Sequence, residues 1–107
     1  IRKRHNAKHI LIAGDFNTDF GSSQYDSMIN FFKLKNFELN DERPFTFDEF
    51  NTWNAKGYKA WIDFIFFQEN KNIKVFNQYI LRPVMKFKNS KMDLADHYQI
   101  VIEAVIY

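Results

Sequence analysis

The sequence contains no cysteine, and this absence excludes several kinds of chemistry. Without cysteine there is no disulfide bond, no thiolate nucleophile and no zinc site with sulfur ligands. The absence does not identify the cellular compartment of the protein. No run approaches the roughly 18 consecutive apolar residues that a membrane-spanning helix requires. The sequence begins Ile1-Arg2-Lys3-Arg4-His5, which has no initiating methionine and no apolar segment after it. These residues do not form a signal peptide, and we expect this sequence to begin within a longer chain.

The composition is that of a folded chain rather than a disordered one. Of the 107 residues, 46% are hydrophobic and 19% are aromatic, which is enough to build a core. The length allows at most one domain, or part of one. The net charge of +2 and the pI near 8.8 are weak evidence for a polyanionic partner.

Hydrophobic spacing predicts one helix and about four strands, which is an α/β pattern. Residues 9–13 are an apolar run that we expect to form a buried strand. Residues 24–36 are expected to form a helix, capped by Ser23 with Asp26 three positions later. Residues 37–51 are rich in loop-forming residues. The first half therefore contains a strand, an amphipathic helix and a long connection.

Strand signals dominate the second half of the sequence. Strands are expected at residues 58–68 and 73–81. Residues 98–107 alternate clearly, and we expect this strand to be buried on one face and largely covered on the other. Residues 83–93 are basic and begin with proline, so they are expected to form an irregular loop.

Acidic residues, an asparagine and a histidine occur at or within these strands, where polar side chains are unusual. They are Asp15, Asn17, Asp63, Asp96 and His97. A buried carboxylate without a partner costs roughly several kcal/mol, so Asp63 needs a donor, and His97 is the candidate. Such a pair favours an imidazolium that faces an anion. Asp96 would point to the opposite side of the chain and suits a hard cation.

Each of these residues also has an ordinary structural explanation. Asp15 fits a turn residue or a helix cap. Asp63 fits an edge strand that faces water, and Asp96 with His97 fits a solvated turn. Their joint occurrence at three strands favours one shared site.

Three short motifs around these residues resemble a known family. Gly14-Asp15-Phe16-Asn17, Ile62-Asp63-Phe64-Ile65-Phe66 and Ala95-Asp96-His97-Tyr98 are similar, in order and rough spacing, to the C-terminal signatures of the endonuclease/exonuclease/phosphatase superfamily. The resemblance implies a DNase I-like fold, a four-layer α/β sandwich with mainly antiparallel mixed sheets and flanking helices. It implies that residues 1–107 are the C-terminal portion of one domain. The N-terminal half would then lie elsewhere in the same chain or in another chain.

The resemblance also implies a role for each residue. Asp15 would orient or deprotonate the attacking water, and Asn17 would hydrogen-bond the scissile phosphate. Asp63 would pair with His97, which would stabilise the transition state. Asp96 would contribute to the metal site. The implied reaction is in-line hydrolysis of a phosphoester with Mg²⁺ or Mn²⁺.

The sequence departs from the family pattern at a few points. Ala95 stands where serine is usual, and Gln99 stands where proline is common. Family members carry a metal-binding glutamate and commonly a second histidine in their N-terminal half. No glutamate of this sequence has a matching context, and His5 and His9 are expected to be solvated. We therefore expect this chain alone to lack a complete site.

The sequence leaves the substrate open. Basic residues cluster at positions 2–8 and 82–91, and they fit either a solvated surface or contacts with a phosphate backbone. Trp61-Ile62-Asp63-Phe64 lacks the cysteine and arginine of the Trp-Cys-Asp-Arg signature of inositol-polyphosphate phosphatases, which weighs against that branch. A nuclease acting on nucleic acid is our first expectation, and a sphingomyelinase-like phospholipid phosphodiesterase is the second. The third is a degenerate member that binds phosphorylated ligands without turnover.

Overall fold

The structure, a computed structural model, describes residues 7–54 and 56–107. The basic residues at positions 2–4 and His5, for which the sequence raised expectations, lie outside the described residues. Within the described part, no helix is long and apolar enough to cross a membrane. The elements of that part are β1 (Leu11–Asp15), α2 (Ser23–Phe32), β2 (Asp63–Phe67), β3 (Ile73–Leu81), β4 (Val84–Phe87), β5 (Ser90–Asp93) and β6 (Gln99–Ile106).

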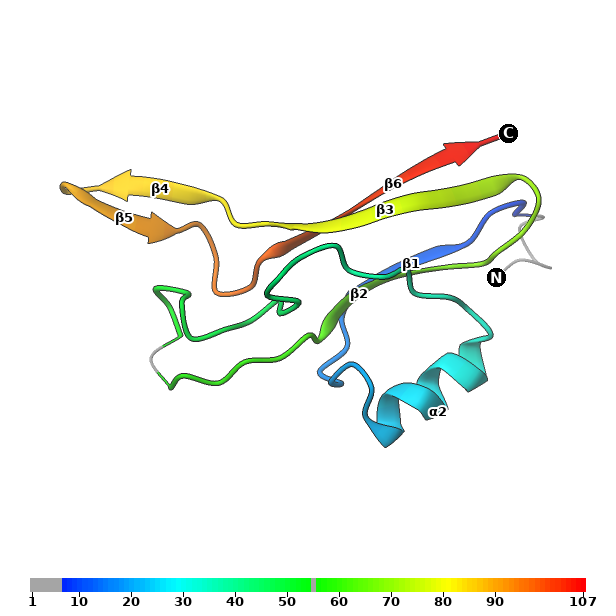
Figure 1. The fold of residues 1–107 in the computed structure, drawn as a ribbon, viewed down its shortest axis with the longest axis horizontal. Coiled ribbons are helices and arrows are strands. Elements are labelled where there is room, and N and C mark those ends of the chain that lie inside the picture. Colours follow the sequence, from blue (N-terminus) through cyan, green and yellow to red (C-terminus); the bar gives the residue numbers. More distant parts are fainter. Residues whose placement is uncertain (1–6, 55) are drawn as a thin grey trace.

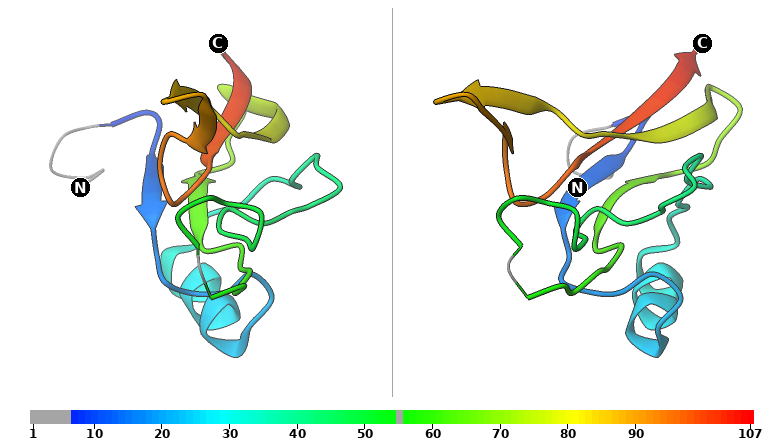
Figure 2. Two further views of the ribbon diagram at one scale, coloured as in Figure 1. Left: turned by 90° about the vertical axis from the view of Figure 1, so that its left-hand side faces the viewer. Right: turned by 60° about the vertical axis from the view of Figure 1, so that its left-hand side comes forward.

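The strands pair into antiparallel two-stranded sheets, β1 with β2, β3 with β6 and β4 with β5. The β1–β2 and β3–β6 pairs lie next to each other, and α2 lies on the side of the β1–β2 pair away from β3–β6 (Figure 1). The β4–β5 hairpin projects away from the rest, as the turned views confirm (Figure 2). Strands β2 and β6 contact each other. The predicted α/β class is therefore confirmed.

The core lies between α2 and the β1–β2 sheet. Its buried members are Tyr25, Leu34, Trp61, Phe64 and Phe66. Phe64 and Phe66 face the same side of β2, because alternate residues of a strand share a face, and their ring centroids are 5.1 Å apart. Burial of each large side chain of this kind contributes about 1.5–3 kcal/mol. This packing fixes β2, and with it the position of the residue that begins the strand.

Helix α2 starts and ends earlier than predicted. Ser22 is the N-cap, because its hydroxyl accepts a backbone N–H of the first turn at 3.1 Å, so the prediction of Ser23 as the cap is wrong. Lys33 adopts a left-handed conformation, with φ of 52°, and ends the helix. Lys35 then exchanges two backbone hydrogen bonds with Phe67. This strand-like pairing uses backbone groups that a longer helix would need.

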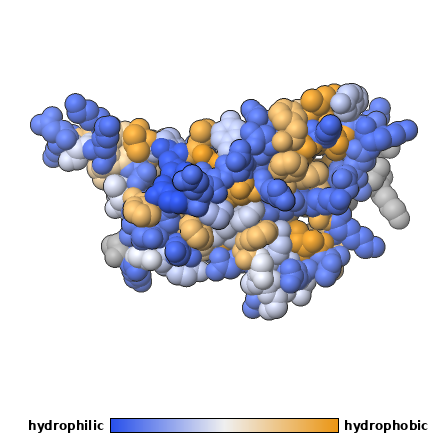
Figure 3. Space-filling model, in the orientation of Figure 1, coloured by the Kyte–Doolittle hydropathy of each residue, from blue (hydrophilic) through white to orange (hydrophobic). Residues whose placement is uncertain are grey.

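Strands β1 and β6 are less buried than the sequence predicts. In β1 only Ile12 is half-buried, and in β6 only residues 100–102 are. Within the described part of the chain, each of these two strands is hydrogen-bonded to a single other strand. Hydrophobic residues consequently reach the surface over the end of the molecule where β3 and β6 lie (Figure 3). The prediction of a buried strand at residues 9–13 and of a strand covered on both faces at residues 98–107 is therefore wrong.

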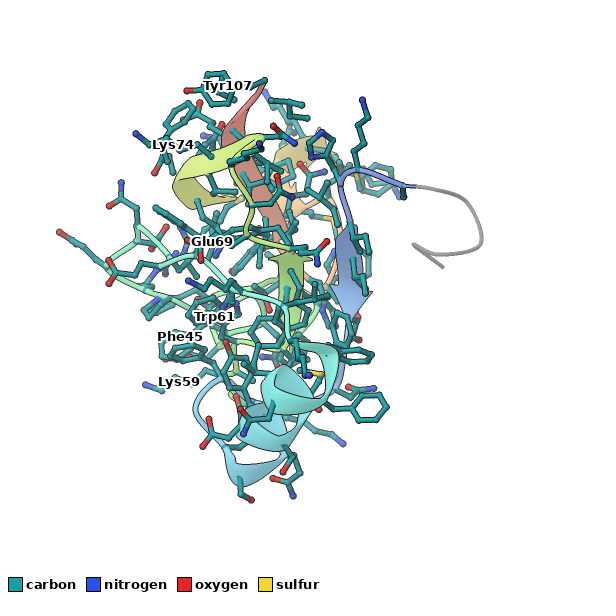
Figure 4. The ribbon with its side chains drawn as sticks, turned by 90° about the vertical axis from the view of Figure 1, so that its right-hand side faces the viewer. Phe45, Lys59, Trp61, Glu69, Lys74 and Tyr107 are labelled. Atoms are coloured by element: carbon teal, nitrogen blue, oxygen red, sulfur yellow. The ribbon has the colours of Figure 1, made fainter. Side chains whose placement is uncertain are left out.

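Strand β2 is shorter than predicted and begins at Asp63. Before it, Ala60 forms an isolated bridge with Phe47. Lys59 lies over the ring of Phe45, with Nζ 5.2 Å from the ring centroid, and these two side chains lie together in Figure 4. Because β2 starts at Asp63, this residue opens a strand instead of interrupting one.

The predicted strand at residues 73–81 is confirmed as β3. The prediction of an irregular loop over residues 83–93 is wrong, because this segment forms the β4–β5 hairpin. Its turn consists of Lys88 and Asn89, with φ of 46° and 64°. Two left-handed residues suit the twist of a tight hairpin, and asparagine tolerates this conformation.

An ion pair connects the long loop after α2 to the end of β3. Arg82 donates to both carboxylate oxygens of Asp41, at 2.9 and 3.0 Å, and the two side chains are 24% and 16% exposed. The hydrogen bond from Arg82 holds the pKa of Asp41 below its usual value, although burial opposes this. The pair therefore stabilises the folded protein while the carboxylate is ionised.

We expect Asp41→Asn to lower the free energy of unfolding at pH 7 by about 2 kcal/mol, a magnitude typical of a charged hydrogen bond. The pKa of Asp41 is lower in the folded than in the unfolded protein. Its contribution is therefore present above the unfolded value of about 3.8 and is lost as the pH falls through the folded value. Urea denaturation of both proteins at pH 7 and at about pH 2.5 measures this difference, which shrinks in acid.

Glu69→Gln provides the control for this measurement. Glu69 pairs with Lys35, and both side chains are more than half exposed. Such a pair contributes at most about 1 kcal/mol. A loss for Asp41→Asn that is equal at both pH values would show that the carboxylate charge is not the source of the stability.

Candidate active site

Antiparallel pairing brings Asp15 and Asp63 together. Asp15 is the last residue of β1, Asp63 is the first residue of β2, and the two are directly opposite in the register. Directly opposite residues project from the same face, with Cβ atoms about 4.5–5.5 Å apart. Two carboxylates therefore share one end of this sheet.

His97 reaches the same place from the segment before β6. Its Nδ1 lies 2.8 Å from Oδ2 of Asp63, and the two side chains are 27% and 18% exposed. The contact predicted between these residues is therefore present. When Nδ1 donates to the carboxylate, Nε2 is the ring nitrogen left to face a ligand.

The pKa of His97 is raised above 6.5. Burial is the largest single influence and lowers this pKa. The hydrogen bond to Asp63 and the charges of Asp63, Asp96 and Asp15 together outweigh it. The site therefore favours an imidazolium, which is the form that stabilises an anion.

One ligand atom from each of Asp15, Asp63 and His97 lies within 4.8 Å of the other two. Carboxylate oxygens are the donors that Mg²⁺ and Mn²⁺ prefer. A protonated imidazole has no free lone pair, so His97 in that form is a charge partner and not a ligand. The two carboxylates are thus the members of this cluster that fit a divalent cation.

The loop after β1 turns tightly around Asp15. The backbone N–H of Asn17 donates to Oδ1 of Asp15 at 2.8 Å, and φ of Asn17 is 48°. Asp15 therefore serves as a turn residue and is also a member of the cluster. The side chain of Asn17 is exposed and lines a groove of about 320 Å³ on the loop that leads to α2. Asn17 thus contacts the cluster through its backbone, while its side chain lines this separate groove.

Asp96 is exposed, and it is not among the residues whose ligand atoms converge. Its negative charge helps to raise the pKa of His97, so it acts on the imidazole electrostatically. Its assignment as a metal ligand stays a prediction.

Thr46 and Phe47 also belong to the site, and the sequence did not single them out. The backbone N–H of Asp63 donates to the hydroxyl of Thr46 at 3.2 Å. The ring centroid of Phe47 lies 5.2 Å from that of His97. The only sequence signal was a threonine between two phenylalanines, a short alternation typical of an extended segment. Both residues contact the Asp63–His97 pair from one loop.

A cavity of about 220 Å³ lies between the β1–β2 sheet and the start of β6. Asp15 and Asp63 line it together with Tyr98 and Ile100. A single water needs about 30 Å³, so the cavity has room for a hydrated cation beside the carboxylates.

Comparison with known proteins agrees with this geometry. Residues 1–97 match the Endonuclease/Exonuclease/phosphatase family. No curated protein and no solved structure matches the chain. Antiparallel sheets with one packed helix are consistent with part of a DNase I-like domain. Because the match includes Asp15, Asp63 and His97 and extends over most of the sequence, the chain belongs to the endonuclease/exonuclease/phosphatase family.

Proposed function

We propose that the protein is a metal-dependent phosphoester hydrolase that cleaves nucleic-acid phosphodiesters by in-line attack of water. The observation that carries this proposal is the 2.8 Å contact between Asp63 and His97, with Asp15 in the same cluster. A phosphodiester resists attack because it is anionic. A fixed imidazolium offsets the negative charge that grows in the transition state.

The side chains of the site divide the tasks of this reaction. The carboxylate of Asp15 orients the attacking water and accepts its proton. The imidazolium of His97, held through Nδ1 by Asp63, presents Nε2 to a phosphate oxygen. The amide of Asn17 donates to the scissile phosphate. Mg²⁺ or Mn²⁺ supplies Lewis-acid chemistry when it is held by the carboxylates, with Asp96 as the further ligand that the resemblance implies.

We also propose that the N-terminal half of the domain, in the same or another chain, completes the site. The exposed strands support this proposal. Leu11 of β1 is 47% exposed and Ile106 of β6 is 60% exposed. A second half that covers these strands would remove apolar surface from water, at about 25 cal/mol per Å². It would also supply the glutamate and second histidine that the resemblance implies.

One face of the β4–β5 hairpin favours nucleic acid as the substrate. Lys86 and Lys91 are directly opposite in the register, and both are exposed. Like charges in this position destabilise a hairpin. A phosphate backbone would relieve the repulsion, because it brings negative charge to both ammonium groups.

The opposite face of the hairpin favours the second candidate, a sphingomyelinase-like phospholipid phosphodiesterase. Met85 pairs with Met92 on that face, and Phe87, on the same side of β4, is 54% exposed. Apolar side chains on a projecting, basic element suit the interface of a lipid bilayer.

A substrate panel separates these candidates. The full-length protein with Mg²⁺ is incubated with plasmid DNA, RNA, abasic DNA, sphingomyelin and phosphoinositides. We expect hydrolysis of a nucleic acid. Hydrolysis of sphingomyelin alone would support the second candidate. Phosphate binding without hydrolysis of any substrate would support the degenerate member and overturn both.

Reversal of the hairpin charges tests the nucleic-acid contact. We expect the Lys86→Glu/Lys91→Glu variant to raise KM for nucleic acid by about tenfold or more, with kcat nearly unchanged. The slope of log affinity against log salt becomes shallower by about 1.8, because two phosphate contacts are lost. Initial rates between 50 and about 200 mM salt measure both quantities.

Lys71→Glu/Lys74→Glu is the matched control for the hairpin variant. These lysines are exposed and lie at the opposite end of β3. If both double variants change KM and the salt slope equally, net charge and not the hairpin governs binding.

A further inference from the structure

A buried carboxyl group outside the cluster has a connection to His97. Asp48 is 0% exposed. Its Oδ1 accepts hydrogen bonds from the hydroxyl of Tyr98, at 2.8 Å, and from the backbone N–H of Phe50, at 3.0 Å. Its Oδ2 has no hydrogen-bond partner among the described residues. A buried polar atom without a partner costs about 1–3 kcal/mol, so this arrangement calls for an explanation.

The segment of residues 46–48 contacts both members of the Asp63–His97 pair. The hydroxyl of Thr46 accepts from the backbone N–H of Asp63 at 3.2 Å. The carbonyl of the same residue accepts from the backbone N–H of Tyr98, the residue after His97, at 2.7 Å. The same segment therefore fixes the backbone beside the carboxylate and beside the imidazole.

The side chain of Tyr98 adds a second connection to this segment. Tyr98 is 5% exposed, and its hydroxyl reaches Asp48. The guanidinium of Arg82 lies over its ring, 5.1 Å from the centroid. Burial and the carboxylate of Asp48 raise the pKa of Tyr98 to about 12, so the hydroxyl keeps its proton at neutral pH. The hydroxyl is therefore a permanent donor to Asp48.

We propose that residues 46–48 are a brace that sets the position of His97 against Asp63, and that Asp48 and Tyr98 are positioning residues for the hydrolytic reaction. The effect on turnover rests on the proposed function, whereas the effect on the imidazole does not. Asp48 holds the phenol, the phenol fixes the backbone next to His97, and the ring of Phe47 lies against the imidazole. A shift of the imidazole away from its productive position lowers the rate without changing substrate affinity.

The test uses the full-length protein and two readouts. We expect Tyr98→Phe to lower kcat by about tenfold with KM unchanged, because the phenyl ring still packs and only the hydroxyl is lost. In NMR spectra the downfield Nδ1 proton of His97 shifts or broadens, because its hydrogen bond to Asp63 lengthens. Asp48→Asn retains an oxygen acceptor for Tyr98, so it preserves kcat and the proton signal better than Asp48→Ala does.

Tyr25→Phe is the matched control, because Tyr25 is also buried and, among the described residues, its hydroxyl bonds to Asn36 alone, from which it accepts at 3.3 Å. This variant leaves kcat and the His97 signal unchanged. We expect the double variant Tyr98→Phe/Asp48→Ala to be no slower than the slower of the two single variants, because each change removes the same hydrogen bond between Tyr98 and Asp48.

Two outcomes decide the proposal. If Tyr98→Phe lowers Tm but leaves kcat and the His97 signal as in Tyr25→Phe, the brace is only structural and the proposal is overturned. If neither the wild type nor any variant hydrolyses a substrate of the panel, but Tyr98→Phe still shifts the NMR signal of the His97 Nδ1 proton, the brace is supported and the proposed function fails.

Discussion

His97→Ala is expected to lower turnover by about 10²–10⁴-fold and to leave the protein folded. The imidazole is 27% exposed and its partner Asp63 is 18% exposed, so water reaches the carboxylate after truncation. The loss appears in kcat because the imidazolium stabilises charge that is present only in the transition state. Initial rates on the preferred substrate of the panel measure the activity, and circular dichroism during heating measures the folding.

The pH dependence gives this prediction a second readout. The folded pKa of His97 is raised, so the pair with Asp63 stabilises the protein fully below the unfolded value of about 6.5. This contribution is lost as the pH rises through the folded pKa. Without added metal, the free energy of unfolding of the wild type therefore exceeds that of His97→Ala most at low pH, and the excess shrinks in base.

His9→Ala is the control, since His9 precedes β1 and lies outside the cluster. Its activity matches that of the wild type. A result in which His97→Ala loses stability and activity in equal measure would assign His97 a structural role instead.

The second large effect is expected for Asp15→Asn, with a loss of turnover of about 10²–10³-fold and a higher Mg²⁺ requirement. An amide accepts no proton from water and binds a divalent cation more weakly than a carboxylate does. It still accepts the backbone N–H of Asn17, so the turn after β1 is retained. Initial rates over a range of Mg²⁺ concentrations separate the change in kcat from the change in metal dependence.

Two further carboxylates complete this experiment. Asp26 is exposed in the first turn of α2, and Asp26→Asn leaves the Mg²⁺ dependence unchanged. Asp96→Asn reports on the other predicted ligand. If Asp96→Asn alone raises the Mg²⁺ requirement, the cation is bound at Asp96 and not at the paired carboxylates of the cluster.

The sequence predicted the contacts of the site better than its surroundings. Asp63 needs a donor, and His97 was predictable as that donor because the cost of an unpaired carboxylate depends only on burial and chemistry. The segment of residues 73–81 was also predicted correctly. Alternation of side chains, however, identifies the residues that share a face and does not show whether another layer covers that face. This is why β1 and β6 were expected to be buried.

The remaining differences arise from contacts between segments that are distant in the sequence. Helix α2 ends at Phe32, and soon afterwards Lys35 pairs with the end of β2, a contact that local helix preference does not reveal. The hairpin depends on the conformations of Lys88 and Asn89, whose neighbours suggested only a charged loop. Asp48 lies in the segment of residues 37–51 that the sequence identified only as rich in loop-forming residues, because its contact is with Tyr98, fifty positions later in the chain.

The register of β1 against β2 also matters to anyone who engineers this protein. Asp15 faces Asp63 directly, and two like charges so placed weaken a strand pair by up to about 1 kcal/mol. A selection for heat resistance alone would therefore enrich neutral replacements of Asp15. The selected variants would have a higher melting temperature but would lack the hydrolytic activity proposed for Asp15. Libraries aimed at robustness should hold both aspartates fixed, because a gain in melting temperature at either position would signal lost chemistry.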